Sequence, residues 1–395
     1  MQPPVTKIPS EIKRWIEIDL DILAANAAEV RRHLSLRCKL MAVIKANAYG
    51  VGSLYAARAL EAGVDMFGVT TLEEAVELRL NGIDTPVLVL ETAAVADLPC
   101  YAKYNIMPAV DSLETLEGFK ALAAPLPFHI IVNTGMNRLG SVPAAALAIA
   151  AAAQNTENAC LSGIFSHLAS AANKNKTAAY AQIALFNKTL KQLEEQGINY
   201  GTAHIAGSAA IVGMPDCAFD MVRAGTLLYG QSPVPLPEAW KIENPWQAQA
   251  KIISISNVPR GQRIGYKGEY AAKKPLRAAV VAIGYADGFA LEPQSRPQSF
   301  GYALREFAVA IARIIMKKPR HYMSYKNHKL RLLGRISMQL TSIDVTDCDA
   351  KVGDAVSFSL RRTSAAPALC RVYKCGGEIV AVESLFADAF AAAKE

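Results

Sequence analysis

The stretch Lys39-Leu40-Met41-Ala42-Val43-Ile44-Lys45-Ala46-Asn47-Ala48-Tyr49-Gly50 sets the pattern for the first half of the chain. A short apolar run suited to a buried strand ends at a lysine, and turn-forming residues follow. Similar runs recur, separated by segments with helical spacing such as Leu72–Leu80 and Ala179–Gln196. We predict eight strands, at Lys39–Ile44, Met66–Val69, Pro86–Leu90, Ile106–Ala109, Phe128–Val132, Leu161–Phe165, Thr202–Ile205 and Leu227–Tyr229. Eight repeated strand–helix units predict a (β/α)₈ TIM-type barrel of the α/β class.

The second half of the chain has a different texture. After Pro233–Pro237, segments such as Gln249–Ser256, Arg277–Ile283, Lys329–Leu333 and Ala355–Ser359 are alternating or β-branched, which is typical of strands. At 395 residues the chain is also long enough for two domains. We therefore predict a barrel over residues 1–237 and a mainly β domain over residues 238–395. Helical spacing over Ala303–Met316 predicts an inserted helix and loop at about residues 299–326.

Composition limits the classes of function. Hydrophobic residues make up 52% of the chain and charged residues 19%, as in a compact globular protein. The net charge of +7 is concentrated between Arg313 and Arg335, and the basic stretch Lys317–Lys329 is a solvated insert more often than a nucleic-acid surface. We expect no nucleic-acid partner.

Neither the cysteines nor the apolar runs indicate a metal site or a membrane segment. The seven cysteines have no CxxC spacing, so we expect no metal centre and no disulfide framework, but mostly buried, reduced thiols. Met1–Ser10 lacks the apolar core of a signal peptide, and no apolar run reaches the roughly 18 residues of a membrane helix. We expect a cytoplasmic protein without a membrane partner.

Lys45 is the first candidate for chemistry. The carboxyl ends of barrel strands face the active site, and Lys45 stands at such an end behind an apolar run. Desolvation lowers the pKa of an amine, which prepares it to form a Schiff base with a carbonyl cofactor. A lysine at one such position is more often a surface group whose amine reaches water, so the position alone leaves both readings open.

Several motifs favour a reactive lysine, because they resemble motifs of the alanine racemase family. Ala42–Gly50 is similar to that family's pyridoxal-phosphate signature, and further matching motifs occur in family order over nearly the whole chain. They are Asn133–Gly140, Ser166-His167, Ala206–Ser208, Val222–Gly230, Tyr266, Gly284–Gly288 and Gly334–Met338.

The resemblance implies a racemase that uses pyridoxal phosphate and two bases. Lys45 would carry the cofactor and serve one face of the substrate's Cα, and Tyr266 would be the base on the other face. Because tyrosine ionises near 10 in water, positive neighbours are needed, and His167 and Arg223 are the matched candidates. Arg223 would also face the pyridine nitrogen of the cofactor.

The other matched positions would bind the cofactor and the substrate. Arg138 would contact the substrate carboxylate, a role suited to a guanidinium, with Met338 and Tyr285 also at the substrate site. The phosphate would be held by Tyr49, Ser208, Gly225, Thr226 and, through an altered C-terminal motif that has Cys370 at the usual tyrosine position, Tyr373. The family also implies a homodimer whose active sites are shared between subunits.

Several positions depart from the family's pattern. Ile131 stands where many members have a lysine, and Ala172 and Gln339 each replace an acidic residue; Asn133 and Ala224 also differ. None of these changes removes a predicted base, so the predicted reaction is the interconversion of L- and D-alanine, which supplies D-alanine for peptidoglycan. Serine or a broader range of amino acids is the alternative substrate set, since one methylene changes selectivity by only about 1–3 kcal/mol.

Two further classes compete with a racemase. A non-catalytic protein that only binds pyridoxal phosphate would need neither Tyr266 nor a second domain. A decarboxylase of basic amino acids, which joins a similar barrel to a β domain, would have cysteine-bearing and acidic motifs that are not evident here.

Overall fold

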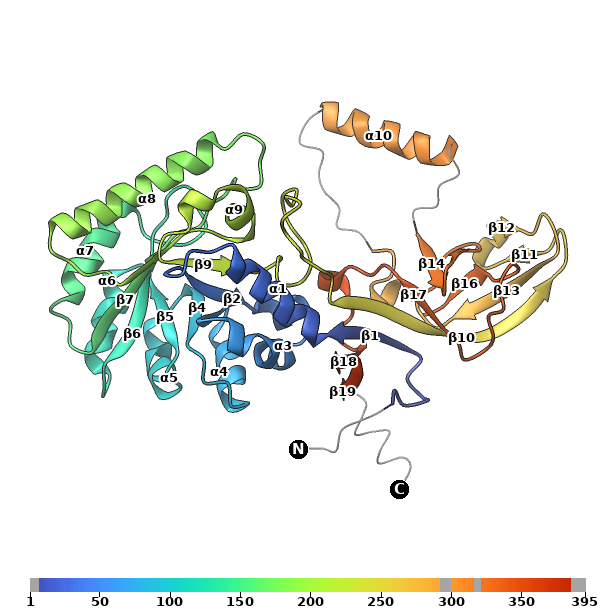
Figure 1. Cartoon of the computed structure of the whole chain (residues 1–395), viewed down its shortest axis with the longest axis horizontal. Coiled ribbons are helices and arrows are strands. Elements are labelled where there is room, and N and C mark those ends of the chain that lie inside the picture. The colour runs from blue at the N-terminus through green and yellow to red at the C-terminus, as the bar shows by residue number, and fades with distance from the viewer. Residues whose placement is uncertain (1–6, 292–299, 316–320, 385–395) are drawn as a thin grey trace, which may run out of the picture. The chain divides into compact units, whose positions relative to one another are not determined.

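The structure, a computed structural model, describes residues 7–291, 300–315 and 321–384 (Figure 1). The chain divides into two compact units. One is Leu20–Pro245, and the other combines Met1–Asp19 with Trp246–Glu395. The predicted division at residues 237 and 238 therefore differs from the structure at both ends of the first unit.

The first unit is a barrel of eight parallel strands in the order β8-β7-β6-β5-β4-β3-β2-β9. The strands are β2 (Lys39–Val43), β3 (Met66–Val69), β4 (Val87–Thr92), β5 (Met107–Val110), β6 (Leu126–Ile131), β7 (Ala159–Phe165), β8 (Thr202–His204) and β9 (Met221–Ala224). At the open edge, Asp220 N donates to Ala203 O at 3.1 Å and Arg223 N to Ala206 O at 2.9 Å. The sheet is thereby a nearly closed barrel, as predicted.

Side chains from six of these strands fill the interior of the barrel. Met41, Leu88, Ala109, Ile131, Phe165 and Met221 form one buried cluster, as expected for a packed barrel core rather than a pore. Helices precede, connect and follow these strands, and the longer helices lie outside the barrel (Figure 1). They are α1 (Leu20–Arg32), α2 (Lys45–Tyr49), α3 (Ser53–Leu60), α4 (Leu72–Leu80), α5 (Leu98–Lys103), α6 (Leu113–Glu117), α7 (Pro143–Ala153), α8 (Thr177–Glu195) and α9 (Ser208–Gly213).

The eighth strand was predicted in the wrong place. It is Met221–Ala224, whereas Leu227–Tyr229 forms a turn in which Leu228 N donates to Gly225 O at 2.9 Å. Leu227, Leu228 and Tyr229 are nevertheless fully buried. A short apolar run is consistent with a strand or with any other buried segment, and here the burial belongs to the turn.

The second unit is built on a mainly antiparallel sheet. Its main path is β15-β14-β17-β10-β1-β18-β19, and β13 pairs with both β10 and β16. A small hairpin of β11 (Arg263–Ile264) and β12 (Tyr270–Ala271) stands apart. The sheet strands are β1 (Arg14–Asp19), β10 (Trp246–Val258), β13 (Leu276–Val281), β14 (Tyr322–Tyr325), β15 (His328–Arg331), β16 (Thr341–Asp344), β17 (Ala355–Phe358), β18 (Cys370–Cys375) and β19 (Glu378–Glu383).

Strand pairing explains why the first residues of the chain belong to the second unit. β1 lies antiparallel to β10, with Ile16 opposite Ala248, and parallel to β18, with Ile16 opposite Arg371. Trp15 packs in a cluster with Cys370 and Val372. Because these partner strands are more than 200 residues away in the sequence, the local sequence pattern did not predict that β1 pairs with them.

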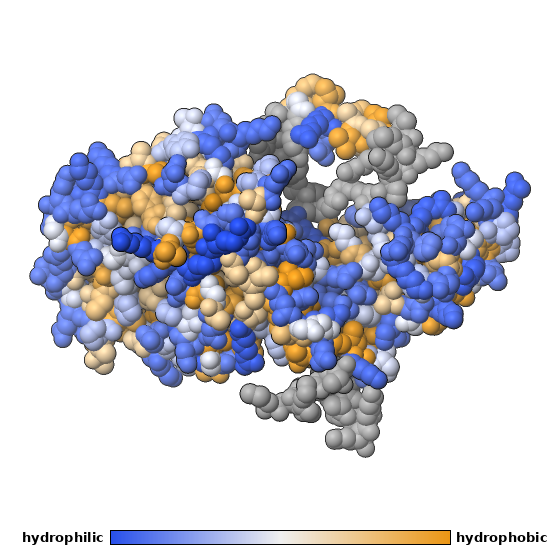
Figure 2. Space-filling view, viewed as in Figure 1, coloured by the Kyte–Doolittle hydropathy of each residue, from blue (hydrophilic) through white to orange (hydrophobic). Residues whose placement is uncertain are grey.

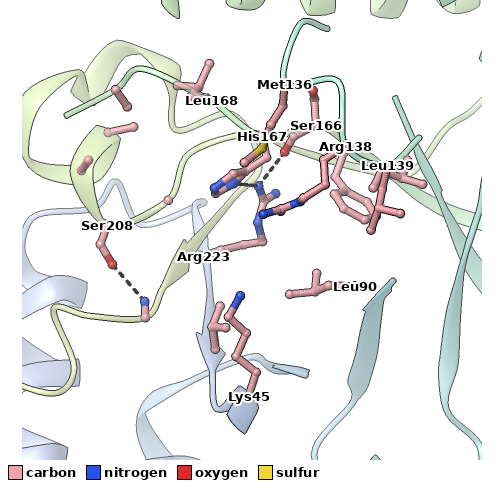
Figure 3. Close-up of a pocket in the computed structure, with 18 of the residues that line it drawn as sticks. Lys45, Leu90, Met136, Arg138, Leu139, Ser166, His167, Leu168, Ser208 and Arg223 are labelled. Carbon is pink, nitrogen blue, oxygen red and sulfur yellow. Dashed lines mark hydrogen bonds between the residues drawn. The ribbon is translucent and has the colours of Figure 1, made fainter. Parts of the chain in front are cut away.

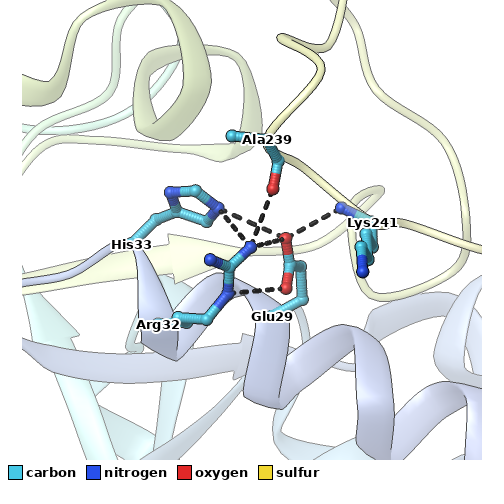
Figure 4. A network of polar contacts seen from close by, with 5 residues as sticks. All are labelled: Glu29, Arg32, His33, Ala239 and Lys241. Atoms are coloured by element: carbon cyan, nitrogen blue, oxygen red, sulfur yellow. Dashed lines mark hydrogen bonds and ion pairs between the residues drawn. The ribbon is translucent and has the colours of Figure 1, made fainter.

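A polar network explains why the first unit extends to Pro245 (Figure 4). The Glu29 carboxylate accepts hydrogen bonds from Arg32 Nη2 at 2.7 Å and from the Lys241 backbone N at 2.8 Å. The ring of His33 stacks on Trp240 with 3.9 Å between centroids. These contacts hold residues 239–241 on α1, and Arg32 holds the pKa of Glu29 down at about 2.

The predicted insert contains one described helix, α10 (Phe300–Ile315), followed by β14 after residues that lie outside the described part. Phe300, Leu304 and Phe307 of α10 are exposed, and Figure 2 shows apolar surface there.

All seven cysteines are free thiols, but only Cys38, Cys217 and Cys370 are buried, so the prediction that most would be buried is wrong. Within the described ranges, no helix combines the length and apolarity needed to cross a membrane.

Candidate active site

A cavity of about 510 Å³ opens at the carboxyl ends of the barrel strands. This size is ordinary for a small-molecule site. Its wall is built by residues in or just after the carboxyl-terminal parts of β2, β3, β4, β6, β7, β8 and β9, and it brings together Lys45, Arg138 and Arg223 (Figure 3). Predicted residues from distant parts of the barrel sequence therefore meet in one space. Three basic side chains at one cavity suit an anionic ligand.

Lys45 points into this cavity from the turn that follows β2 (Figure 3). Burial lowers the pKa of the Lys45 amine, and the positive charges of Arg138 and Arg223 lower it further. The negative charge of Glu74 acts in the opposite direction. A lysine in this setting is more easily deprotonated than one at the surface, so the amine can act as a nucleophile or a base.

The turn that follows Lys45 has a rare backbone conformation. Ala46, Asn47, Ala48 and Tyr49 all have φ between 50° and 57°, in the left-handed region. Such a conformation destabilises a non-glycine residue by roughly 1–2 kcal/mol. It persists only where surrounding contacts enforce it. One such contact joins Ala46 N to the Glu74 carboxylate at 2.5 Å.

Arg223 is the buried centre of the site. Its Nη2 donates to Ser166 O at 2.6 Å and to His167 Nδ1 at 3.1 Å, and its Nη1 donates to His204 Nδ1 at 2.6 Å. Burial lowers the pKa of Arg223 to about 9, so the guanidinium stays charged at neutral pH. The bonds hold this charge at a fixed place in the cavity wall.

The histidines around Arg223 are neutral. Because Arg223 donates to Nδ1 of His204, the proton of that ring lies on Nε2, which is 2.9 Å from Nδ1 of His129. Burial, followed by the charge of Arg223, lowers the pKa of His129 and of His167 to about 3. Of the two predicted positive neighbours for a tyrosine base, Arg223 therefore carries the charge and His167 does not.

Sequence reasoning missed His129 and His204, although a signal was present. Both lie within barrel strands, on β6 and β8, among mostly apolar buried residues. A polar side chain at such a position usually has a buried partner. Gly163 allows this arrangement, since a Cβ there would lie 2.3 Å from the ring of His129.

Arg138 is presented by a turn after β6. Asn133 Oδ1 accepts from the backbone N of Gly135 and of Asn137, both at 3.0 Å, and Gly135 has a φ of 135°. Among the described residues, Arg138 forms no ion pair with a carboxylate. Its guanidinium is therefore available to bind an anion at the cavity. Ile131, one of the positions that depart from the family, also lines this cavity.

Four of the five predicted phosphate-binding residues, Tyr49, Ser208, Gly225 and Thr226, line this cavity. The Gly225 backbone N donates to Ser208 Oγ at 3.0 Å, and a Cβ at Gly225 would lie 2.6 Å from the Tyr49 hydroxyl. Thr226 Oγ1 is buried and has no hydrogen-bond partner among the described residues. A buried hydroxyl without a partner is unfavourable, so a polar ligand group here would satisfy it.

Three predicted site residues lie on adjoining segments of the second unit, and all three are exposed. The backbone N of Tyr285 donates to Ser337 O at 3.1 Å, and Ala286 N donates to Met338 O at 2.9 Å, so these two segments adjoin. Gly334, four residues before Met338, approaches the backbone of Ile264, just before Tyr266. Tyr266 is 68% exposed, Met338 59% and Tyr285 45%.

The prediction for Tyr373 is not supported. Its side chain is fully buried in β18, and its hydroxyl donates to Glu383 Oε2 at 2.7 Å. Cys370, at the position where the family has its tyrosine, is buried as well. Tyr373 is therefore a core residue of the second unit's sheet, and it was predicted because it is the nearest tyrosine to the altered motif.

These features define the chain as a barrel enzyme whose reactive amine lies in a cationic cavity at the carboxyl ends of the strands. Residues 18–233 match the N-terminal domain of alanine racemase, and residues 246–372 match its C-terminal domain. An alanine racemase of Desulfosudis oleivorans is 33% identical over 364 residues, which are 88% of this chain and 87% of that protein. The chain belongs to the alanine racemase family of isomerases.

Solved structures of the family have the same fold. The alanine racemase of Clostridium difficile 630 superimposes with a TM-score of 0.82 at 28% identity, covering 95% of this chain and 99% of that one. The alanine racemase of Bacillus anthracis with bound L-Ala-P gives 0.79 at 25% identity, covering 96% and 100%.

Proposed function

We propose that this chain is a pyridoxal-phosphate-dependent racemase that interconverts L- and D-alanine with Lys45 and Tyr266 as its two bases. The observation that carries the proposal is the amine of Lys45, which has a lowered pKa and faces the same cavity as Arg138 and Arg223. The L-Ala-P in the Bacillus anthracis structure supports alanine as the substrate class.

The residues of the cavity fit pyridoxal phosphate. Thr226 Oγ1, buried without a partner among the described residues, and the Ser208 hydroxyl would hold the phosphate beside Gly225, where a larger residue would meet Tyr49. Lys45 would bind the cofactor covalently, and Arg223 would face its ring. When bound, the cofactor supplies an electron sink that makes the substrate's Cα proton acidic.

The chain's own groups would then bind the substrate and move the proton. Arg138 would hold the substrate carboxylate through parallel N–H groups. Lys45 Nζ would take or return a proton on one face of Cα, and the Tyr266 phenol would do so on the other. Arg223, fixed by Ser166 O and His204, would donate to the ring nitrogen without giving up its proton, and a ring nitrogen left unprotonated would limit how far negative charge spreads into the ring. This restraint favours proton return over side reactions.

We further propose a homodimer in which a second copy of the chain supplies Tyr266. Tyr266, Tyr285 and Met338 are large side chains exposed on adjoining segments of the second unit. Exposed apolar and aromatic groups gathered in this way often mark an interaction surface. Seated at the cavity of a second copy, Tyr285 and Met338 would contact the substrate. The product D-alanine would serve peptidoglycan synthesis.

Isotope exchange tests the proposed reaction. Purified protein with added pyridoxal phosphate is incubated in deuterated water with one L-amino acid at a time, including alanine, serine and a basic amino acid. The proposal predicts deuterium at Cα and loss of chirality, fastest for alanine. Release of carbon dioxide would identify a decarboxylase, and bound cofactor without exchange would identify a binding protein.

A further inference from the structure

Glu74 joins two loops at the mouth of the barrel. Its Oε1 accepts a hydrogen bond from Ala46 N at 2.5 Å, and its Oε2 accepts from Thr70 N at 2.8 Å. Thr70 follows β3, whereas Ala46 follows β2 and is the next residue after Lys45. One carboxylate therefore ties the backbone that carries the reactive amine to the neighbouring loop.

Glu74 is itself held in place by the start of α4. Thr71 caps this helix, with its hydroxyl accepting from Glu74 N at 3.4 Å while the Glu74 carboxylate accepts from Thr71 N at 3.3 Å. Such a reciprocal cap usually serves only to begin a helix. Here the free oxygen of the same carboxylate reaches the loop after β2, which a local cap does not require.

The bond to Ala46 lies where the backbone most needs support. Ala46 begins the run of left-handed residues that ends at Tyr49, and the cavity is lined by Lys45, just before this run, and by Tyr49 at its end. Within the run, Ala48 N donates to Ile44 O at 2.8 Å and Gly50 N to Asn47 O at 2.9 Å. These two bonds are internal to the turn, whereas the Glu74 bond joins the turn to the loop that follows β3.

We propose that Glu74 is a positioning residue that holds Lys45 in its reactive place through the N–H of Ala46 and that also acts on the amine by its negative charge. The inference rests on the role proposed above for Lys45. Among the described residues, Arg138, Glu74 and Arg223 act on the charge of Lys45, and of these three Glu74 is negative. Glu91 lines the same cavity. Neutral His167 also lies at this cavity.

Two variants separate the geometry from the charge. Glu74→Gln removes the charge. It also leaves one acceptor oxygen, whereas the carboxylate of Glu74 offers one oxygen to Ala46 N and the other to Thr70 N. Glu74→Asp keeps the charge on a shorter side chain. Glu77→Gln is the control, because it removes the same charge from an exposed position one turn along α4.

The first readout is the reactivity of Lys45 as a function of pH. Each protein is treated with pyridoxal phosphate, reduced with borohydride and digested, and the adduct on the Lys45 peptide is measured by mass spectrometry. Glu74→Gln should move the midpoint of labelling to lower pH, because loss of the negative charge lowers the pKa of the amine. It should also slow labelling at high pH by about 10-fold or more. Glu74→Asp should slow labelling with little change in midpoint, and Glu77→Gln should match the wild type.

The second readout is amide hydrogen exchange at Ala46 in protein without cofactor. Loss of a bond to a charged acceptor should speed exchange about 10-fold or more in Glu74→Gln. A residue that only caps α4 would change thermal stability and leave both readouts of Lys45 and Ala46 at wild-type values, which would overturn the inference. If wild-type protein is not labelled at Lys45, the proposed function fails and this inference fails with it. Normal wild-type labelling with an unchanged Glu74→Gln overturns the inference alone.

Discussion

The barrel cavity and the exposed segments around Tyr266, Tyr285 and Met338 of the second unit contain the two halves of the predicted site, and they are built differently. In the cavity, Arg223 is fixed by Ser166 and two histidines, and Lys45 lies in a turn that Glu74 secures. On the second unit, Tyr266, Tyr285 and Met338 are largely exposed, and the backbone of their turns positions them.

This difference indicates what each half can do alone. A preorganised cavity can bind a cofactor and hold charge in place without further parts. Tyr266 lies on the unit that does not contain the cavity, so its phenol needs a partner surface to reach the reacting atoms. We therefore expect cofactor binding to depend on the barrel and turnover to depend on both halves.

The largest effect is expected from Tyr266→Phe. Removing one general base should lower racemisation by about 10²- to 10⁴-fold, while cofactor absorbance and thermal stability stay at wild-type values because the ring is exposed. Tyr180→Phe, at an exposed position of α8, is the control and should change nothing. Near-normal racemisation by Tyr266→Phe would contradict the proposal that Tyr266 of the second unit is a base.

A smaller effect on the cavity itself is expected from Gly225→Ala. The new Cβ would lie 2.6 Å from the Tyr49 hydroxyl, so the tyrosine must shift out of the proposed phosphate site. Overpacking of about 1–3 kcal/mol should weaken pyridoxal-phosphate affinity about 10-fold in a fluorescence titration. Gly301→Ala, whose Cβ would point into open space, should bind normally. Unchanged affinity in Gly225→Ala would place the phosphate elsewhere.

The smallest effect is expected on the scaffold of the barrel, from Glu29→Gln. The pKa of Glu29 is about 2 in the fold against an ordinary 4.5, so its stabilising contribution is complete above about pH 4.5 and is lost as pH falls toward 2. The variant should lower the free energy of unfolding by about 1–3 kcal/mol at pH 7, and the deficit should shrink below pH 4.5. Denaturant titrations at several pH values measure this. Glu117→Gln, which loses an exposed pair with Lys120, should have little effect. A deficit that does not change with pH would contradict the account.

Sequence alone predicted the barrel better than the boundaries of its unit. Apolar runs located seven of the eight strands, because each buried strand is a short hydrophobic segment between turns. The same rule misplaced the eighth, since Leu227–Tyr229 is buried without being a strand. β1 and the Glu29 network depend on partners more than 200 residues away, which local pattern does not reveal.

Site residues that belong to a sequence motif could be predicted. Residues that serve the site only through their packing and hydrogen bonds could not. Motifs identified Lys45, Arg138, Arg223 and Ser208, and the barrel brings them to one cavity. They did not identify His204, which acts on Arg223 from within a strand, nor Glu74, whose capping pattern reads as purely local. Tyr373 shows the opposite error. It was chosen because it is a tyrosine close to the position where the family has one, but its side chain is buried.

The most direct test of the central claim combines two inactive variants in one dimer. Lys45→Ala and Tyr266→Phe chains are co-expressed with different tags, and dimers that carry both tags are purified. If a second copy supplies Tyr266, each mixed dimer has one site with both bases intact and should racemise alanine at about half the wild-type rate. Mixed dimers no more active than either variant alone would contradict the claim that the two copies share the site.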